Sequence, residues 1–191
     1  MNLPRRSAAL VIVAVIIIAG AAGALWYQYL YPVHHFAEVE AGVLYRCGQP
    51  DEEQMVLLTE RYHLRTVVNL RGTEGNADWY VREERFCADH HLNFVTLDLT
   101  NREHIRSNLR GFLEVMADTA NHPVLVHCEI GSARTGFAVA AYRIAFQKWS
   151  LDQALAEAGR FNFKPDVHLN PEYVKVLRDL AGGADWHKLA D

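Results

Sequence analysis

The chain has 191 residues, of which 50% are hydrophobic and 22% charged, and its 19 Lys and Arg against 23 Asp and Glu give a formal net charge of -4. This length fits one domain, or one domain with an appendage. The apolar content excludes collagen-like, low-complexity and disordered classes. The acidic balance argues against a nucleic-acid partner, which would need a concentrated excess of Lys and Arg. Three cysteines are too few for a fold that is stabilised by disulfide bonds, so a hydrophobic core must stabilise this protein.

Residues 1–32 differ in composition from the rest of the chain. No charged residue occurs between Ala8 and Tyr31, and Arg5 and Arg6 come just before this apolar run. At about 1.5 Å of rise per residue, a helix of this length would cross a hydrocarbon core of roughly 30 Å. The sequence therefore predicts a transmembrane helix that anchors the chain, with residues 33–191 as a separate globular domain.

The charges beside the apolar run predict the orientation of this anchor. Arg5 and Arg6 precede it, and no Lys or Arg follows until Arg46. The positive-inside rule then places the N-terminus in the cytoplasm and the domain outside the cell membrane, which is the periplasm in a Gram-negative cell. A cleaved signal peptide is the alternative, since the small residues 19–24 could hold a cleavage site. The apolar run continues past that site into an aromatic cluster, which favours the uncleaved anchor.

Beyond Pro32, short β-rich runs alternate with longer amphipathic runs. The predicted strands are 43–47, 64–70, 92–97 and 123–127, and the predicted helices are 50–62, 76–90, 104–121, 136–149, one capped by Ser150 with Gln153, and one opened by Asn170 and Pro171. This alternation predicts an α/β fold in which helices flank a central parallel or mixed sheet of about four to five strands. Such sheets carry their sites at the C-terminal ends of the strands.

The strand PVLVH runs directly into the loop CEIGSARTG, residues 128–136, and then into a helix. The backbone N–H groups of such a loop converge on one point, and the helix dipole reinforces them, which makes an anion site. Cys128 begins the loop in this positive field, which favours its thiolate, the reactive form. Arg134 can fold back and offer its planar fork of donors to two phosphate oxygens. These parts suit attack on a phosphoryl group.

HCEIGSARTG resembles the HC-x5-R-[ST]-G signature of the cysteine-based protein tyrosine phosphatase superfamily, and its compact form is most similar to the dual-specificity group. LYRCGQP, the strand ending NLRG and the segment AAYRI…WSLDQALAE resemble bacterial members, so the resemblance covers about 150 residues. It implies a dual-specificity phosphatase fold for residues 33–191. It also implies hydrolysis of phosphomonoesters through a phosphocysteine intermediate, with no metal and no cofactor.

The resemblance also implies roles for the residues of the loop. Cys128 would be the nucleophile, and Arg134 would bind the phosphate together with the loop amides. His127 would orient the loop and help keep the thiol ionised, and the Thr135 hydroxyl would assist the thiolate and the breakdown of the intermediate. The implied substrate-binding residues are Glu129, Ile130, Gly131, Ser132, Ala133 and Arg134.

The mechanism needs an acid that protonates the leaving oxygen and later acts as a base for water. In this family the acid is an Asp upstream of the nucleophile. Asp98 in VTLDLTN, just past the third predicted strand, fits best by position, since no WPD tripeptide is present. Glu103 and His104 are weaker candidates on the same loop. The alternative for Asp98 is a helix cap or turn residue.

Other reactive side chains have simpler interpretations. Cys47 and Cys87 fall on predicted elements and are expected to be small core residues. The adjacent pairs His34-His35 and His90-His91 have no ligand partner at i+4, so surface histidines are favoured over a metal site. Arg71 in NLRG either reaches the phosphate site or, as we favour, pairs with an acid or a carbonyl at the strand end.

The composition of the loop also bears on the substrate. Glu129, Ile130, Ser132 and Ala133 place one acid and no extra cation between Cys128 and Arg134, which should disfavour highly charged substrates. A phosphorylated protein, or a lipid phosphate near the anchoring membrane, is the expected partner, and the sequence leaves the choice among phosphotyrosine, phosphoserine or phosphothreonine and phospholipid open. Two alternatives are a non-catalytic phosphate-binding pseudophosphatase and the sulfur or arsenate chemistry of rhodanese-like and arsenate-reductase proteins.

Overall fold

The computed structural model describes residues 13, 16–17, 19–20 and 33–190. The chain divides into two units after Pro32, and all the elements discussed below belong to the unit that begins at Val33. The predicted membrane anchor over residues 1–32 lies almost entirely outside the described residues. Within the part of the chain that is described, no helix combines the length and apolarity needed to cross a membrane.

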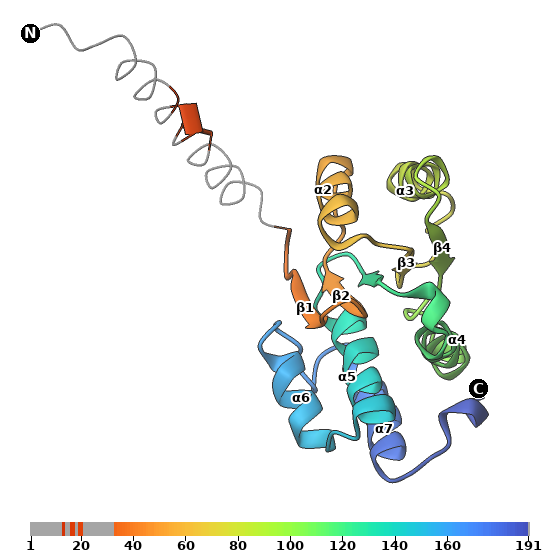
Figure 1. Ribbon diagram of the computed structural model, residues 1–191. Helices are drawn as coiled ribbons and strands as arrows, with labels where there is room; N and C mark the ends of the chain where they lie inside the picture. Colours follow the sequence, from red (N-terminus) through yellow and green to blue (C-terminus); the bar gives the residue numbers. More distant parts are fainter. Residues whose placement is uncertain (1–12, 14–15, 18, 21–32, 191) are drawn as a thin grey trace, which may run out of the picture. The chain divides into compact units, whose positions relative to one another are not determined.

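A five-stranded mixed sheet forms the centre of this unit (Figure 1). Its strands, in spatial order, are β1 (Ala37–Glu40), β2 (Leu44–Cys47), β5 (Val124–His127), β3 (Thr66–Asn69) and β4 (Asn93–Thr96). Only the β1–β2 pair is antiparallel. The predicted α/β class with a mixed sheet is therefore confirmed. The sequence analysis missed β1, because its four residues AEVE contain only one fully buried position, Val39.

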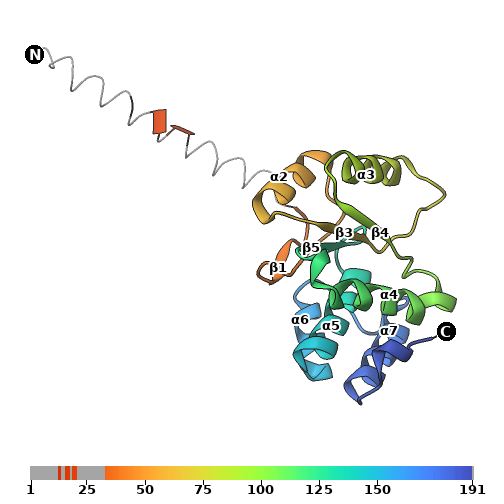
Figure 2. The ribbon, with the colours of Figure 1, turned by 45° about the vertical axis from the view of Figure 1, so that its right-hand side comes forward.

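Helices cover both faces of the sheet (Figures 1 and 2). One face carries α2 (Glu52–Tyr62) and α3 (Asp78–Asp89), and the other carries α4 (Ile105–Ala117), α5 (Ala133–Gln147), α6 (Leu151–Gly159) and α7 (Asn170–Ala181). Successive strand residues point to opposite faces. Accordingly, Val67 and Leu125 pack with α2 and α3, whereas Val68 and Val126 join the larger core on the other side.

Two helix boundaries differ from the prediction. Helix α5 begins at Ala133 and not at 136, because the Ser132 carbonyl already accepts a hydrogen bond from the Gly136 amide at 2.7 Å. Helix α4 ends at Ala117, since Asp118 has an extended backbone and its carboxylate accepts from the Ala120 amide, which starts a separate turn over 119–121. The predicted capping box of Ser150 with Gln153 is present at the start of α6.

The register of the parallel strands brings the ends of four of them to one edge of the sheet. Cys47 of β2 and Asn69 of β3 both lie opposite His127 of β5, and Asn69 lies opposite Thr96 of β4. The segments that leave these strands therefore gather at one edge. Since this is the edge at which α/β sheets carry their sites, the loop after His127 lies where a functional site is expected.

Candidate active site

The loop 128–132 connects β5 to α5 and packs tightly against the end of β2. Gly131 has φ +78°, and a Cβ there would lie 2.6 Å from the carbonyl carbon of Cys47 and from the amide nitrogen of Gly48. A Cβ on Gly48 would in turn lie 2.9 Å from the Ile130 carbonyl oxygen. Both positions therefore require glycine, and the two backbones are in direct contact.

Three successive carbonyl groups of this loop, those of Glu129, Ile130 and Gly131, accept hydrogen bonds from outside it. The donors are the Gln49 amide to Glu129 O (2.9 Å), Nδ1 of His34 and of His35 to Ile130 O (2.8 and 2.9 Å), and Nη2 of Arg46 to Gly131 O. In a trans peptide the C=O and the following N–H point in opposite directions. Holding the carbonyls outward thus turns the next amides inward, and the Gly131 amide does donate to Cys128 Sγ at 3.3 Å.

Cys128 lies at the base of this amide cradle and is 2% exposed. The first turn of α5 follows at once, and its N–H groups lack intrahelical partners and add positive potential at the loop. Thr135, in that turn, is fully buried and its hydroxyl has no hydrogen-bond partner. The structure places Cys128, the loop amides and Thr135 at the junction of β5 and α5, with Arg134 and Thr135 inside the helix and not before it.

His127 has a partner that the sequence analysis missed. Its Nε2 lies 2.8 Å from Oε1 of Glu83 on α3, and both side chains are buried. The two atoms are close enough for an ion pair, but their geometry does not meet the angular criteria for a hydrogen bond. Glu83 occupies the apolar face of α3 between Tyr80 and Phe86, and an acid at a core position was the signal available in the sequence.

Arg134 forms an ion pair with Glu129 of the loop. Its Nη2 lies 3.5 Å from Oε2 of Glu129, whose side chain is more than half exposed. A pair with an exposed partner contributes little, about 0–1 kcal/mol, so a bound oxyanion can displace the carboxylate. Arg134 is therefore available to an anion in the pocket at small cost.

Asp98 lies on the segment that follows β4. Its Oδ1 accepts hydrogen bonds from the Thr100 amide (2.8 Å) and the Thr100 hydroxyl, and its backbone bridges Arg71. The turn role weighed from the sequence is therefore present, and the acid role stays a prediction. Glu103 lines a different cleft with Arg102 and Lys175, and neither Asp98 nor Glu103 is among the residues that line the cavity at Cys128.

Tyr173 of α7 connects these parts and was also missed. Its hydroxyl donates to the Leu99 carbonyl at 2.6 Å, and its ring stacks on Phe137 of α5 at 4.3 Å. Burial, opposed by the charge of Arg134 and assisted by those of Cys128 and Asp98, raises the pKa of Tyr173 well above its usual value. Tyr173 thus stays neutral and fixes the Asp98 segment against the helix that carries Arg134.

A cavity of about 310 Å³ opens over Cys128. One side is formed by the loop itself and the other by the segment 160–169 between α6 and α7, which contributes Lys164, Val167 and His168. Asn170 orders this segment, because its Nδ2 donates to the Lys164 carbonyl at 2.6 Å. The sequence analysis missed this wall, since nothing in the local pattern of 160–169 connects it to a loop 30 residues earlier.

The remaining expectations concern the arginine and cysteines near the site. Arg71 pairs with Glu74 at 3.0 Å and stacks on Trp79 at 3.7 Å, so it has the structural role that we favoured. Cys47 and Cys87 are buried in the core under α2 and α3. Burial raises the pKa of the Cys87 thiol to about 12 and that of Cys47 well above its usual value, as expected for unreactive core thiols. Among the described residues, no group of three or more His, Cys, Asp or Glu is placed to hold a metal ion.

Comparison with known proteins finds relatives over most of the chain. Inositol diphosphatase SIW14 of Saccharomyces cerevisiae is 30% identical over 161 residues, which are 78% of this chain and 52% of the yeast protein. Inositol diphosphatase DSP1 of Oryza sativa is 32% identical over 137 residues, 69% of this chain and 59% of the rice protein. The chain thus spans between half and two thirds of these curated relatives.

A solved structure shares the fold. The crystal structure of TpbA from P. aeruginosa matches with a TM-score of 0.55 and 25% identity, over 74% of this chain and 87% of that one. The model of the tyrosine phosphatase family matches residues 30–179, which include every element of the sheet and the whole cysteine loop. The chain belongs to the tyrosine phosphatase family.

Proposed function

We propose that the protein hydrolyses phosphomonoesters of proteins, phosphotyrosine first and phosphoserine or phosphothreonine second, through a phosphocysteine intermediate. The observation that carries this proposal is the loop geometry. A buried thiol accepts a hydrogen bond from a loop amide, carbonyls are held away from it, and Arg134 stands at the rim. This arrangement favours a thiolate nucleophile beside an oxyanion. It argues against a pseudophosphatase, which would not need the nucleophile.

In the first step, Sγ of Cys128 attacks the phosphorus atom. The S–P bond forms, the bond from phosphorus to the leaving oxygen breaks, and the leaving oxygen takes the proton of the Asp98 carboxyl group. The three equatorial oxygens receive hydrogen bonds from the inward-facing amides and from the guanidinium of Arg134. The amides are fixed before substrate arrives, because the carbonyls on the other side of the same peptides are already bonded.

In the second step, water attacks the phosphocysteine. The Asp98 carboxylate takes a proton from the water, the new P–O bond forms, and the S–P bond breaks to return the thiolate and inorganic phosphate. Thr135 is suited to assist here, since its buried hydroxyl is otherwise without a partner and can donate to the leaving sulfur. The Tyr173 bond to Leu99 holds the segment that carries Asp98 through both steps.

The rim of the pocket supports phosphotyrosine. Ile130 is 55% exposed and Val167 is 38% exposed, and both line the cavity over Cys128. Exposed apolar side chains beside an anion site suit an aromatic ring attached to the phosphate. A variant of TpbA has been crystallised in complex with pTyr, which supports the same substrate class for this chain.

A second candidate is a substrate with more than one phosphate, either an inositol phosphate or a lipid phosphate. The loop itself has no extra cation, but Lys164 brings positive charge to the same cavity from outside it, and His168 lines the cavity beside it. The relatives SIW14 and DSP1 are named inositol diphosphatases. The loop alone disfavours polyanions, and Lys164 reduces that preference because it adds a positive charge to the cavity.

We also propose that residues 1–32 tether the enzyme to the cell membrane, with the catalytic domain outside the cytoplasm. The support is the charge-free run after Arg5 and Arg6. We expect intact-mass spectrometry of the membrane fraction to find the full-length chain. A mature chain that begins near Leu25 would instead indicate a cleaved signal peptide.

Cys128→Ser is expected to abolish hydrolysis of an aryl phosphate, because a hydroxyl in the same position is not ionised at neutral pH. The wild-type rate should be unchanged in EDTA and blocked by vanadate. Steady-state kinetics on p-nitrophenyl phosphate provides the measurement, and Cys87→Ser, in the core away from the loop, is the control. Activity that EDTA removes, or that survives in the Cys128 variant, contradicts the mechanism.

Asp98→Asn is expected to lower kcat by about 10²-fold or more, because the amide cannot donate a proton to the leaving oxygen. The loss should shrink for a substrate whose leaving group is already a weak base. Glu103→Gln, on the same segment but in another cleft, should retain the wild-type rate. A near-wild-type kcat for the Asp98 variant would assign the acid to a different residue.

Lys164→Ala distinguishes the two substrate classes. If a second phosphate sits near Lys164, the variant loses about three- to tenfold in kcat/KM on a diphosphoinositol substrate and keeps its kcat/KM on a phosphotyrosine peptide. Lys188→Ala, an exposed cation outside the pocket, is the matched control. Equal kcat/KM values for wild type and variant on both substrates would show that Lys164 does not contribute to substrate recognition.

A further inference from the structure

Arg46 is a buried cation that the mechanism above does not use. It lies on β2, a strand with no exposed residue, and is only 1% exposed. Among the described residues, its Nε and Nη1 have no hydrogen-bond partner, and its guanidinium lies 3.8 Å from the centroid of the Phe161 ring. The carboxylate whose charge acts on it, Glu157, is already bonded to Arg143. A buried charge without a partner of its own is costly, so its position requires an explanation.

The one hydrogen bond that Arg46 makes is to the cysteine loop. Its Nη2 donates to the carbonyl oxygen of Gly131, the residue whose own amide donates to Cys128 Sγ at 3.3 Å. Gly131 is also the loop residue with positive φ. Holding its carbonyl outward fixes the peptide between Gly131 and Ser132, and therefore turns the Ser132 amide inward.

Arg46 also acts on the loop through its charge. Burial lowers the pKa of Arg46 to about 10, and the charges of Cys128, Glu157 and Cys47 oppose this shift, with Cys128 contributing most. Arg46 therefore remains protonated at neutral pH. Since the attraction between two charges is mutual, the cation stabilises a thiolate on Cys128 as much as the thiolate stabilises the cation.

Other titratable groups also surround Cys128. They are Cys47 on β2, His127 with Glu83, Glu129 and Arg134 of the loop and α5, Asp98 after β4, and Tyr173 on α7. Arg134 and Lys164 are cations on the pocket side, where His168 also lies. Arg46 differs from them because it does not line the pocket and cannot be drawn away by substrate.

We propose that Arg46 is a positioning residue of the cysteine loop: its guanidinium holds the Gly131 carbonyl outward, and its fixed charge stabilises the Cys128 thiolate from beneath the loop. This role deepens the proposed phosphatase function, and its kinetic part rests on that function. The thiolate itself can be measured without turnover, so the two proposals fail separately.

Two variants separate the charge of Arg46 from its hydrogen bond. Arg46→Gln keeps an N–H donor for Gly131 and removes the charge, whereas Arg46→Lys keeps the charge on a single ammonium. The readout is the pH dependence of Cys128 alkylation by iodoacetamide, with the modified site identified by peptide mass spectrometry. We expect Arg46→Gln to raise the alkylation midpoint by about one pH unit, so that alkylation below the midpoint is roughly tenfold slower. We expect Arg46→Lys to keep a midpoint near that of the wild type.

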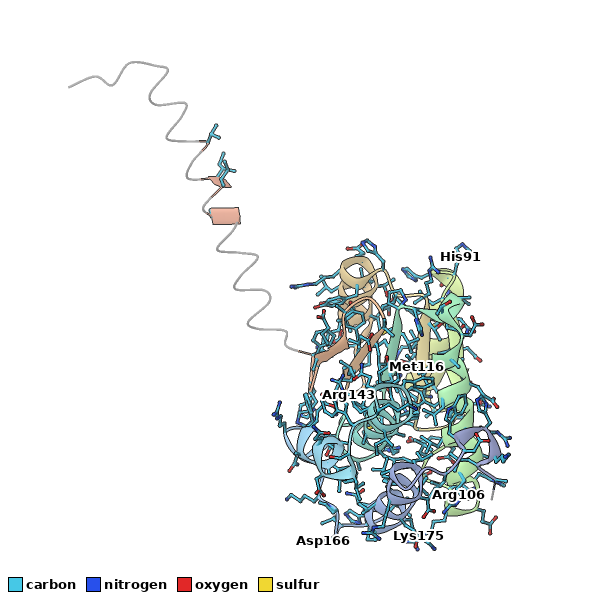
Figure 3. The ribbon with its side chains drawn as sticks, turned by 60° about the horizontal axis from the view of Figure 1, so that its bottom comes forward. His91, Arg106, Met116, Arg143, Asp166 and Lys175 are labelled. Carbon is cyan, nitrogen blue, oxygen red and sulfur yellow. The ribbon has the colours of Figure 1, made fainter. Side chains whose placement is uncertain are left out.

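The acid limb of the kcat/KM profile on an aryl phosphate should move in the same direction in Arg46→Gln. Arg143→Gln is the matched control, since Arg143 on α5 (Figure 3) is also a buried arginine, 8% exposed, but bonds Glu157 and Gln147 and not the loop. It should lose stability and keep the wild-type midpoint. Circular dichroism and thermal unfolding show which variants fold.

An unchanged alkylation midpoint in folded Arg46→Gln overturns the proposal, and so does an equal shift in Arg143→Gln, which would reflect general destabilisation. If Arg46→Gln does not fold, Arg46→Lys tests the proposal in its place. An alkylation midpoint at the wild-type pH, together with a reduced kcat, supports the proposal. An alkylation midpoint raised by as much as one pH unit contradicts it. If the wild-type protein is alkylated at Cys128 but hydrolyses no phosphoester, the proposed function is wrong. The alkylation results alone then test the role of Arg46.

Discussion

The site depends on three carbonyl groups that point away from it. A loop of five residues cannot direct its amides at one anion unless the opposite ends of the same peptides are held elsewhere, because each peptide is planar. Here the Gln49 amide, the two histidines His34 and His35, and Arg46 hold them. All four donors come from the segment 34–49, which leads into and out of β2. A segment that does not line the cavity over Cys128 is therefore the one that shapes the anion cradle.

This constraint gives the segment LYRCGQP a structural role beside the cysteine loop. Gly48 must be small because the Ile130 carbonyl approaches it, Arg46 supplies a donor, and Gln49 supplies an amide. The β2–β5 pairing places Cys47 beside His127, so the segment after one strand meets the segment after the other. The two motifs lie about 80 residues apart in the chain and form one structural unit.

The fold was predictable where a pattern is local. Runs such as TVVN and VLVH identify buried parallel strands, and the sequence from His127 to Gly136 identifies the loop. The missed residues act across the tertiary structure. Lys164 and His168 reach the pocket only because α6 and α7 place their connecting segment there. Glu83 and Arg46 are charged residues within otherwise apolar patterns. Such a pattern indicates that the charge has a buried partner, but it does not identify that partner.

The distribution of charge around Cys128 links these features. The chain is acidic overall, and its loop has a carboxylate beside Arg134, yet the thiol lies among an arginine beneath the loop, an arginine at its rim and the positive end of a helix. In the proposed mechanism, the buried cation outside the pocket favours the thiolate before substrate binds, whereas Arg134 at the rim pairs with the phosphate. Under this proposal, the division of the two tasks between Arg46 and Arg134 allows substrate to engage one cation while the thiolate stays in the field of the other.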